Sequence, residues 1–579
     1  MLVKQMCDLQ QHGGPDDEGF FTAADHSLVL GHRRLSLLDL SKKGHQPMQL
    51  ANRYTITYNG EIYNFKEIKE ELAALGHLFS SHSDTEVILA AYAQWGVQSF
   101  AKLKGMFAFA LWDEHTKELI LVRDPSGIKP LYFSIDEEGI SFASEIRAFQ
   151  MLEESNASNA HWPVFLMAYG HLPEPVTTLQ KVRVLPKGCC IKYKATHHSW
   201  NLQSYKHYSY SSQVHSTGTA TNAIKESLQL AVNAHLIADA PIGVFLSGGI
   251  DSGIIASLAS QQQKEQLHSL SLYFEETEFS EKPYQDILIN QLRCKSHQYL
   301  LKEAEFEERL PQVLAAMDMP SCDGINTWFI SKAAKAQGLK AVLSGIGADE
   351  LFGGYPSFSR IGLAAQIQKM PGFMLEAGKK SNQKKLNRLS YLGMEGIKGI
   401  YLFLRGHFTV HEIARQLNMA EKEVWDILND TPMLPDTSNL ATKNQASWME
   451  LNLFMQNQLL RDVDAMGMAH GIEIRVPFLD DDFVQLALSI NPALKYSGRI
   501  PKAMLVNPFK DLLPKPIWDR PKMGFRFPFK SWMEKSSYVQ AHMMQANEAT
   551  RVNYKKFKEG KLHWSQILSL LILNNAGHA

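Results

Sequence analysis

The segment at residues 244–252, Val-Phe-Leu-Ser-Gly-Gly-Ile-Asp-Ser, carries the strongest chemical signal in the sequence. An apolar run leads into two glycines, which let a backbone turn sharply and approach a ligand closely. A helix is predicted to begin directly afterwards, and free N–H groups at a helix N-terminus attract anions. Ser247 and Ser252 add hydroxyl donors, and Asp251 is suited to hold Mg2+ on phosphate groups. The pattern predicts a nucleotide site and differs from the G-x-x-x-x-G-K-S/T loop of γ-phosphate transfer. Ser-Gly-Gly alone would fit an ordinary strand–turn–helix connection.

A second glycine-rich segment follows the same logic at residues 342–355, Val-Leu-Ser-Gly-Ile-Gly-Ala-Asp-Glu-Leu-Phe-Gly-Gly-Tyr. Ligands of parallel sheets bind beyond the carboxyl ends of the strands. We therefore expect both segments to converge on one nucleotide, with Asp251 and Asp349 sharing a metal ion. The alternative is that Asp349 and Glu350 only cap a helix.

The chain up to about residue 205 has short apolar runs separated by turn residues, which indicates an α+β domain around a largely antiparallel sheet. Strands are predicted at residues 27–40, 54–58, 119–122, 131–134 and 140–143. Apolar residues at helical spacing predict helices at residues 65–75 and 85–95.

A change in composition and hydrophobic periodicity near residue 205 predicts a second domain. Residues 204–221 are rich in Ser, Thr, Tyr and His without regular periodicity, so we place the first domain at 1–205, a linker at 206–222 and the second domain at 223–579. Helices then alternate with strands, which indicates a parallel sheet with helices on both faces. These strands are predicted at residues 241–246, 267–274, 296–301 and 340–343. From about residue 358 the chain is predicted to be mostly helical.

Composition excludes several classes of protein. Apolar residues make up 45% and charged residues 21% of the 579 residues, which is typical of a globular protein with more than one core. Lys plus Arg is 59 and Asp plus Glu is 60, so no charge excess suggests nucleic acid or an anionic membrane as a partner. The five cysteines are too scattered for a disulfide framework or a zinc site, and their odd number fits a reducing, cytoplasmic compartment. No signal peptide or membrane span is predicted.

Further motifs lie at residues 460–470 (Leu-Arg-Asp-Val-Asp-Ala-Met-Gly-Met-Ala-His), 473–480 and 520–525 (Arg-Pro-Lys-Met-Gly-Phe). Taken alone, their charges, including Arg475 and Asp480, predict buried ion pairs in a helical domain. Together with the glycine-rich segments they make the chain resemble the glutamine-dependent asparagine synthetase family over nearly its whole length. The resemblance implies an α/β C-terminal ATP-pyrophosphatase domain with a parallel sheet and added helices.

The resemblance also implies a reaction. ATP adenylates a side-chain carboxylate, pyrophosphate leaves, and ammonia displaces AMP, which turns aspartate into asparagine. Mg2+ and a lysine neutralise the charge on pyrophosphate. Lys502 matches that lysine, and Asp349 is a further candidate catalytic residue. The residues expected to contact ATP are Phe245, Leu246, Ser247, Gly248, Gly249, Asp251, Ser252, Leu272, Ser344 and Gly345.

The first domain resembles a class II glutamine amidotransferase, whose fold is an αββα sandwich of the N-terminal nucleophile hydrolase type. By this resemblance Arg34 holds the glutamine carboxylate, because a guanidinium fork suits a planar carboxylate. Asn59 and Gly60 are expected to contact glutamine and form the oxyanion hole, and Glu61 and Asp84 to bind the substrate amine. Asn59-Gly60 alone would indicate a hairpin turn.

Four features depart from the family pattern. The family begins with Met-Cys-Gly, whose cysteine is the nucleophile, whereas this sequence starts Met-Leu-Val-Lys-Gln-Met-Cys and reaches His-Gly-Gly-Pro-Asp at residues 12–16. We therefore expect the first strand and the nucleophile to be absent, Cys7 to be a small buried helix residue, and glutamine not to be hydrolysed by the family route. Gly13 stands where Arg is usual, Ile346 where asparagine-making members carry Glu, and Val506 where Arg is frequent.

Three hypotheses follow. The leading one is a glutamine-hydrolysing asparagine synthetase, or a close paralogue that amidates another carboxylate, because Ile346 cannot take a proton. The second is a β-lactam or macrolactam synthetase-like ligase, which the retained glutamine-site residues oppose. The third is a non-catalytic nucleotide-binding regulator, which Asp251, Asp349 and Lys502 oppose. The expected partners are glutamine or ammonia, aspartate or another carboxylate, ATP with Mg2+, and a second copy of the chain in a homodimer.

Overall fold

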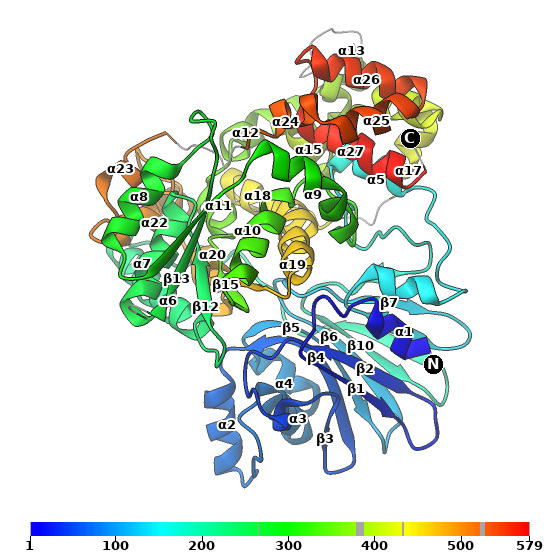
Figure 1. Cartoon of the computed structure of the whole chain (residues 1–579), viewed down its shortest axis with the longest axis vertical. Coiled ribbons are helices and arrows are strands. Elements are labelled where there is room, and N and C mark those ends of the chain that lie inside the picture. The colour runs from blue at the N-terminus through cyan, green and yellow to red at the C-terminus, as the bar shows by residue number, and fades with distance from the viewer. Residues whose placement is uncertain (1, 264–265, 378–386, 431–433, 522–526, 578–579) are drawn as a thin grey trace.

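The computed structural model describes residues 2–263, 266–377, 387–430, 434–521 and 527–577. In Figure 1 the blue to cyan part of the chain, apart from helix α5 (Trp162–Tyr169), forms a β-rich half. The green to red remainder forms a second sheet with flanking helices and a group of further helices at the top of the view.

The β-rich half is built on an antiparallel sheet of six strands in the order β11-β10-β6-β5-β4-β3. Its central strand β5, sequence Gly-Met-Phe-Ala-Phe-Ala-Leu-Trp-Asp, is buried on both faces, so it lacks polar alternation. The strands are β3 (Met48–Leu50), β4 (Tyr54–Ile62), β5 (Gly105–Asp113), β6 (Glu118–Arg123), β10 (Cys189–Lys194) and β11 (Ser199–Ser204).

Two small sheets form the second β layer. One pairs β1 (Asp17–Thr22) with β2 (Val29–Arg34), and the other has the order β8-β7-β9. A core that includes Leu30, Trp112, Leu121 and Phe133 lies between this layer and the six-stranded sheet. Helices cover the outer faces, which completes an αββα sandwich: α1 (Leu2–Asp8) lies against β2, and α3 against β4. The remaining elements are β7 (Tyr132–Ile135), β8 (Ile140–Ala143), β9 (Arg183–Val184), α2 (Phe65–Ala74), α3 (Asp84–Trp95) and α4 (Ser99–Lys102).

The second sheet is parallel throughout, with the order β14-β13-β12-β15-β16. Its strands are β12 (Ile242–Phe245), β13 (His268–Tyr273), β14 (Lys295–Leu300), β15 (Ala341–Leu343) and β16 (Glu473–Arg475). One face packs on α6 (Thr217–His235) and α7 (Ile250–Gln263), and the other on α10 (Ile325–Ala336) and α19 (Leu460–Met468).

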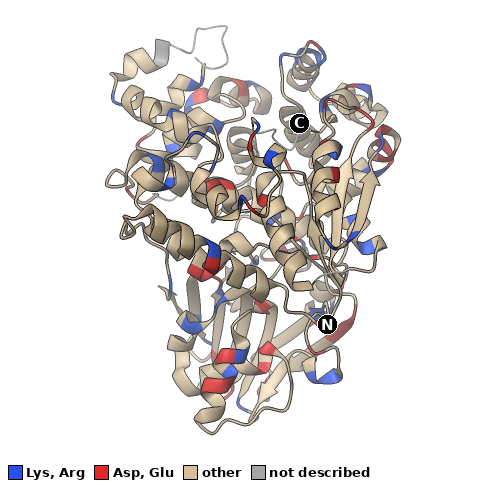
Figure 2. Ribbon diagram, turned by 90° about the vertical axis from the view of Figure 1, so that its left-hand side faces the viewer, with Lys and Arg blue, Asp and Glu red and all other residues tan. Residues whose placement is uncertain are grey.

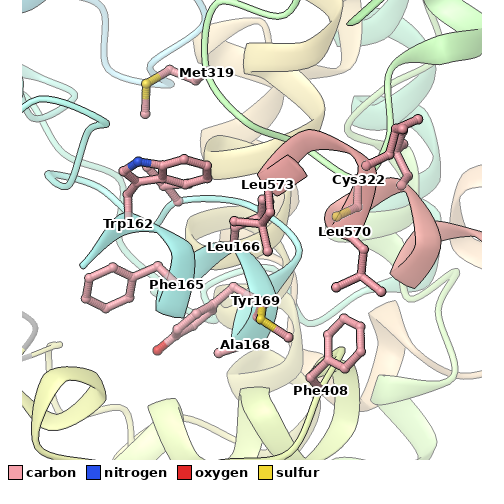
Figure 3. Close-up of a cluster of buried hydrophobic side chains, with 14 of the residues drawn as sticks. Trp162, Phe165, Leu166, Ala168, Tyr169, Met319, Cys322, Phe408, Leu570 and Leu573 are labelled. Atoms are coloured by element: carbon pink, nitrogen blue, oxygen red, sulfur yellow. The ribbon is translucent and has the colours of Figure 1, made fainter. Parts of the chain in front are cut away.

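A large helical region completes the molecule. Helix α5 (Trp162–Tyr169), which lies within the first 205 residues, packs against C-terminal helices, so the two halves interlock (Figure 3). The cluster drawn there includes Trp162, Phe165, Leu166, Tyr169, Met319, Cys322, Phe408, Leu570 and Leu573. Further helices are α8 (Lys282–Gln291), α9 (Glu303–Ala316), α11 (Ala348–Phe352), α12 (Ser357–Gln368), α13 (Gly372–Ala377), α15 (Gly396–Arg405), α16 (Val410–Leu417), α17 (Glu421–Asn429), α18 (Thr442–Met449), α20 (Asp481–Ser489), α21 (Pro492–Lys495), α22 (Ala503–Val506), α23 (Lys515–Trp518), α24 (Phe529–Lys535), α25 (Ser537–Gln545), α26 (Glu548–Lys558) and α27 (Trp564–Asn575).

Most predicted elements are confirmed within one residue, including the four parallel strands from 241 to 343 and the helices at 65 and 85. The strand predicted at 27–40 is too long: it ends at Arg34, where the chain turns back and the guanidinium binds the carbonyls of Leu38 and Asp39. Helix α6 begins at Thr217, inside the segment predicted as a linker at 206–222, with the Ser216 hydroxyl accepting the Thr219 N–H at 3.4 Å.

Two further segments differ from what their local sequence indicates. The strand predicted at 54–58 continues to Ile62, so Asn59-Gly60 lies in mid-strand opposite Ala108 and Phe107 rather than in a hairpin turn. Residues 473–475 are not helical but form the parallel edge strand β16. Figure 2 shows acidic and basic residues interspersed over both halves, as the balanced composition predicts. No helix of the described residues is long and apolar enough to cross a membrane.

Candidate active sites

The two glycine-rich segments meet at the carboxyl ends of adjacent strands. β12 and β15 pair in parallel, and each runs directly into its predicted loop. The loops touch: a Cβ placed on Gly345 would lie 3.0 Å from the Asp251 Cβ and from the Ser252 N. Gly345 therefore allows the close approach that brings both segments to one place.

Lys502 joins the two loops from a position distant in sequence. Its Nζ lies 2.5 Å from both carboxylate oxygens of Asp251 and 2.6 Å from Oδ1 of Asp349. Burial acts to lower the pKa of Lys502, but the two carboxylates outweigh it and raise that pKa above its ordinary value. The Lys502 backbone is left-handed at φ 52°, which is unfavourable for a residue with a Cβ. Such strain is typical of functional positions.

A cavity of about 1000 Å³ opens beside this charge cluster. Most residues predicted to contact ATP line it, namely Phe245, Leu246, Ser247, Asp251, Ser252, Leu272, Ser344 and Gly345, together with Asp349. Gly248 and Gly249 are not among its lining residues. Gly248 has a φ of 82° and its carbonyl accepts a hydrogen bond from Arg520 at 2.9 Å, while the Gly249 N–H donates to the Ser247 hydroxyl at 3.3 Å. These two glycines shape the loop. Residues 522–525 of the predicted motif lie outside the described residues.

The same cavity has acidic and aromatic walls that the sequence did not predict. Asp323 and Asp462 line it, and the Ser321 hydroxyl donates to Asp462 at 2.7 Å. Glu350 also lines it, and its Oε1 accepts the Tyr355 hydroxyl at 2.7 Å. Asp462 and Glu350 fall inside the quoted motifs, but only their tertiary positions identify them as lining residues. Ile346 lines the cavity too, and Phe279, Phe527, Phe529 and Trp564 supply aromatic surface.

The predicted metal ligands, Asp251 and Asp349, have the right chemistry for Mg2+, but two carboxylates are too few to hold the ion by themselves. Two carboxylates from the first turns of different helices, Asp251 of α7 and Asp349 of α11, converge at the cavity, and hard oxygen donors suit Mg2+ when phosphate oxygens complete the set. Within the described ranges no group of three or more His, Cys, Asp or Glu residues could hold a metal by itself. Any ion at Asp251 and Asp349 would therefore rely on the nucleotide for further ligands.

A second cavity of about 540 Å³ lies in the αββα half. Residues of β2 and β8, two strands of separate sheets, line it. All residues predicted to bind glutamine line it: Arg34, Asn59, Gly60, Glu61 and Asp84.

These residues are already engaged with protein partners. The Arg34 guanidinium donates to the carbonyls of Leu38, Asp39 and Ser41 at 3.0, 2.7 and 3.3 Å. The Asp84 carboxylate accepts the Tyr58 hydroxyl at 2.8 Å and the Ile62 N–H at 3.0 Å, and burial raises its pKa. The Asn59 amide donates to the Ser144 hydroxyl at 3.4 Å.

Gly60 and Cys7 are explained by packing. A Cβ on Gly60, at φ 142°, would lie 2.0 Å from the Met106 carbonyl oxygen, so only glycine fits between β4 and β5. Cys7 lies in α1, as predicted, and is buried against Gly31. Burial raises the pKa of its thiol to about 11, so it is protonated at neutral pH and is not an activated nucleophile.

Comparison with known proteins assigns each half of the chain to a family. The asparagine synthase family matches residues 223–562, and the glutamine amidotransferase domain family matches residues 1–206. The chain belongs to the asparagine synthase family. "Asparagine synthetase [glutamine-hydrolyzing] 1" of Bacillus subtilis is 29% identical over 554 residues, which cover 92% of this chain and 85% of that protein. A "Putative asparagine synthetase [glutamine-hydrolyzing]" of Mycobacterium tuberculosis is 30% identical over 576 residues, with coverages of 93% and 86%. "Amidase chry2" of Gibberella zeae is 27% identical over 576 residues, with coverages of 91% and 84%.

One helix separates the two cavities of this asparagine synthase family member. Asp462 and Val463 of α19 line the larger cavity, and Asp464 and Met468 line the smaller one. Asp464 belongs to a buried chain of charges, since Lys129 Nζ lies 3.1 Å from its Oδ1 and 3.6 Å from Glu473 Oε2. Arg475 continues the chain to Glu61, so the ion pairs predicted for Arg475 exist, but they lie between the two sites. Asp480 instead caps α20, because its carboxylate accepts the N–H groups of Asp482 and Phe483 at 3.1 and 3.3 Å.

Proposed function

We propose that this protein is an ATP-dependent amide ligase that adenylates a carboxylate, releases pyrophosphate and lets ammonia displace AMP. Ammonia, free or taken from glutamine, is the proposed nitrogen donor, and aspartate is the first candidate acceptor. The observation that carries the proposal is the contact of Lys502 with Asp251 and Asp349, beside two glycine-rich strand ends and a cavity of about 1000 Å³. Membership of the asparagine synthase family supports the same reaction class.

The chain's own residues have separate proposed roles at the nucleotide. The N-terminus of α7 and the hydroxyls of Ser247 and Ser252 orient the phosphates. Lys502 stabilises the negative charge that develops on pyrophosphate as it leaves, which lowers the barrier to adenylation. Asp251 and Asp349 would hold Mg2+, which supplies further neutralisation of the phosphate charge.

At the smaller cavity we propose that Arg34 binds the glutamine carboxylate and that Glu61 and Asp84 bind its ammonium group. Asn59 and Gly60 supply the oxyanion donors. All five line one cavity, which supports a common ligand.

The acceptor carboxylate has a second candidate besides aspartate. Ile346 puts an apolar side chain into the cavity at the position where asparagine-making relatives are expected to carry Glu. This favours amidation of another carboxylate as the second candidate. One relative is named an amidase and not an asparagine synthetase.

Pyrophosphate release with ATP, Mg2+ and ammonium tests the proposal. Aspartate is the first acceptor, followed by other amino acids and small carboxylic acids. Acceptor-dependent release that falls in Asp251→Ala supports the proposal. Release that is unchanged in Asp251→Ala removes that residue from its role, and no release with any acceptor contradicts the ligase reaction.

We further propose a cytoplasmic homodimer. Free thiols at all five cysteines support a reducing compartment. Light scattering of the purified chain measures the oligomeric state, and a mass of one chain, 65.3 kDa, would contradict the dimer.

A further inference from the structure

Glu350 is a buried carboxylate in the wall of the larger cavity, with 1% of its surface exposed. It lies in the first turn of α11, directly after Asp349, and its Oε1 accepts the Tyr355 hydroxyl at 2.7 Å. No lysine or arginine of the described residues pairs with it. A carboxylate that is buried in a cavity wall without a counter-ion is available to take up a proton.

Its neighbours in the same loop do not offer this chemistry. Asp349 is held by Lys502, whose Nζ lies 2.6 Å from the Asp349 Oδ1. Ile346 lines the cavity four residues before Glu350, and its side chain has no group that accepts a proton. Among these three side chains of the loop, Glu350 is therefore the one suited to proton transfer.

We propose that Glu350, positioned by the Tyr355 hydroxyl, is the base that takes a proton from ammonia when ammonia attacks the acyl-adenylate. The proposal rests on the function proposed above, and it assigns to Glu350 a step that Ile346 cannot perform.

The step is balanced with groups already named. The nitrogen lone pair of ammonia forms the new C–N bond, and the nitrogen becomes positively charged. One N–H proton then passes to the Glu350 carboxylate, and the C–O bond to AMP breaks with its electron pair on the phosphate oxygen. The products are the amide, AMP and a protonated Glu350, which returns its proton to water. Burial, with a smaller effect of Asp349, raises the pKa of Glu350 to about 7, which suits a base that works near neutral pH.

Tyr355 holds this carboxylate in place and keeps its own proton. Burial and the charge of Glu350 raise the pKa of the Tyr355 phenol well above its ordinary value. The Arg405 guanidinium lies 4.7 Å from the centre of the tyrosine ring and pairs with Glu450 at 2.7 Å. The ring is therefore fixed by packing, and its hydroxyl holds the Glu350 Oε1 at one position.

Two rates measured on the full-length chain separate this step from adenylation. Exchange of radioactive pyrophosphate into ATP, with aspartate or the acid that supports pyrophosphate release, requires adenylation but no ammonia. Amide formation with ammonium chloride requires both steps. In Glu350→Gln we expect the exchange rate to be retained and the rate of amide formation to fall by about 10²-fold or more, because a positioned base contributes on this scale.

Hydroxylamine provides a second readout. It is a stronger nucleophile and a weaker base than ammonia, so its attack on the acyl-adenylate depends less on a neighbouring carboxylate. Hydroxamate formation is therefore expected to fall in Glu350→Gln by a much smaller factor than amide formation. A carboxylate with a purely structural role would lower both products alike.

Two further variants test the assignment. Tyr355→Phe keeps the ring against Arg405 and removes the hydroxyl, so it should lower amide formation by about 10-fold, the effect of one hydrogen bond to a charged group, with exchange retained. Asp462→Asn is the matched control, because Asp462 is 5% exposed, lines the same cavity and accepts one hydroxyl, that of Ser321, at 2.7 Å. The ratio of amide formation to exchange should be unchanged in this control.

Three results overturn the proposal. They are unchanged amide formation in a folded Glu350→Gln, an equal fall of exchange and amide formation in that variant, or a fall of their ratio in Asp462→Asn as large as in Glu350→Gln. Thermal unfolding reports whether each variant folds, and Tyr355→Phe decides if Glu350→Gln does not. Absence of exchange with every acid in the unsubstituted chain refutes the ligase reaction and this inference with it. Exchange and undiminished amide formation in Glu350→Gln refute this inference alone.

Discussion

The two cavities hold their charged residues in different ways. In the larger one, Asp251, Asp349 and Lys502 come from three distant segments and form one cluster beside the cavity, in which a single ammonium faces two carboxylates. In the smaller one, Arg34 and Asp84 are engaged with nearby backbone and side-chain groups of the sandwich. The nucleotide side therefore has a charge cluster that a ligand and its metal ion can join. The glutamine side has ligands that must share or exchange protein partners.

The largest effect of this difference is expected at Lys502. Lys502→Met removes the one cation that contacts both Asp251 and Asp349 in the described structure. Because that charge is proposed to stabilise departing pyrophosphate, the rate of acceptor-dependent pyrophosphate release should fall by about 10²–10³-fold. Stopped-flow or coupled-enzyme detection of pyrophosphate measures the rate.

Lys495→Met is the control for that substitution. Lys495 is equally buried, but its Nζ donates to the Ala487 carbonyl at 2.8 Å, away from both cavities. A similar loss of rate in both variants would mean that burial of any lysine matters, and the special role of Lys502 would be lost.

A smaller effect is expected at Arg34. Arg34→Lys replaces a planar fork with a single ammonium, which cannot hold a carboxylate through two parallel bonds and also brace the loop carbonyls. Loss of one charge-assisted hydrogen bond corresponds to a weakening of glutamine binding by about 10–100-fold. Calorimetry gives the dissociation constant of glutamine. Arg53→Lys serves as the comparison, because Arg53 forms a partly exposed ion pair with Asp113. Unchanged affinity would leave Arg34 as a loop brace only.

The sequence carries a more local signal for the nucleotide side than for the glutamine side. Apolar strands followed by Ser-Gly indicate where β12 and β15 end, and the parallel pairing then brings both ends together. Lys502 has no local signal, and only the family resemblance singled it out. Gly248 and Gly249 illustrate the limit of a motif, since they shape the loop while neighbouring residues line the cavity.

Tertiary pairing overrides local signals elsewhere. Asn59-Gly60 has the composition of a hairpin turn, yet β5 continues alongside it and keeps the chain extended. β16 was missed because Glu473 and Arg475 are charged, and their burial depends on partners such as Glu61 and Lys129 in the other half. The start of α6 could have been predicted from the sequence, since Ser216 is an ordinary N-cap residue.

The mid-strand position of Gly60 leads to a stability prediction. Gly60→Ala combines positive φ with a Cβ 2.0 Å from the Met106 oxygen, so β4 and β5 must separate. Backbone strain alone costs about 1–3 kcal/mol, and the steric clash adds to it. Urea unfolding should show a lower midpoint than for Gly338→Ala, whose Cβ at φ 72° meets nothing within 4 Å. Equal midpoints would show that strand contact at Gly60 is unimportant.

The smallest expected effect is a change in the free energy of unfolding per pH unit at Lys495, the residue used above as the control for Lys502. Burial lowers the pKa of Lys495 from 10.5 to about 7, whereas Lys502, with two carboxylates, has a raised pKa. Between about pH 7 and 10.5 the unfolded chain binds a proton at Lys495 that the folded chain lacks, so this residue makes the free energy of unfolding rise with pH. The slope is about 1.4 kcal/mol per pH unit for one proton. Below pH 7 both states are protonated and the slope from this residue vanishes. Lys495→Met should therefore lose stability relative to the unsubstituted chain as the pH rises from 7 to 10, measured by urea unfolding at each pH. If the difference between the two proteins is constant over that range, Lys495 stays charged in the fold, and burial without a counter-ion does not neutralise a lysine here.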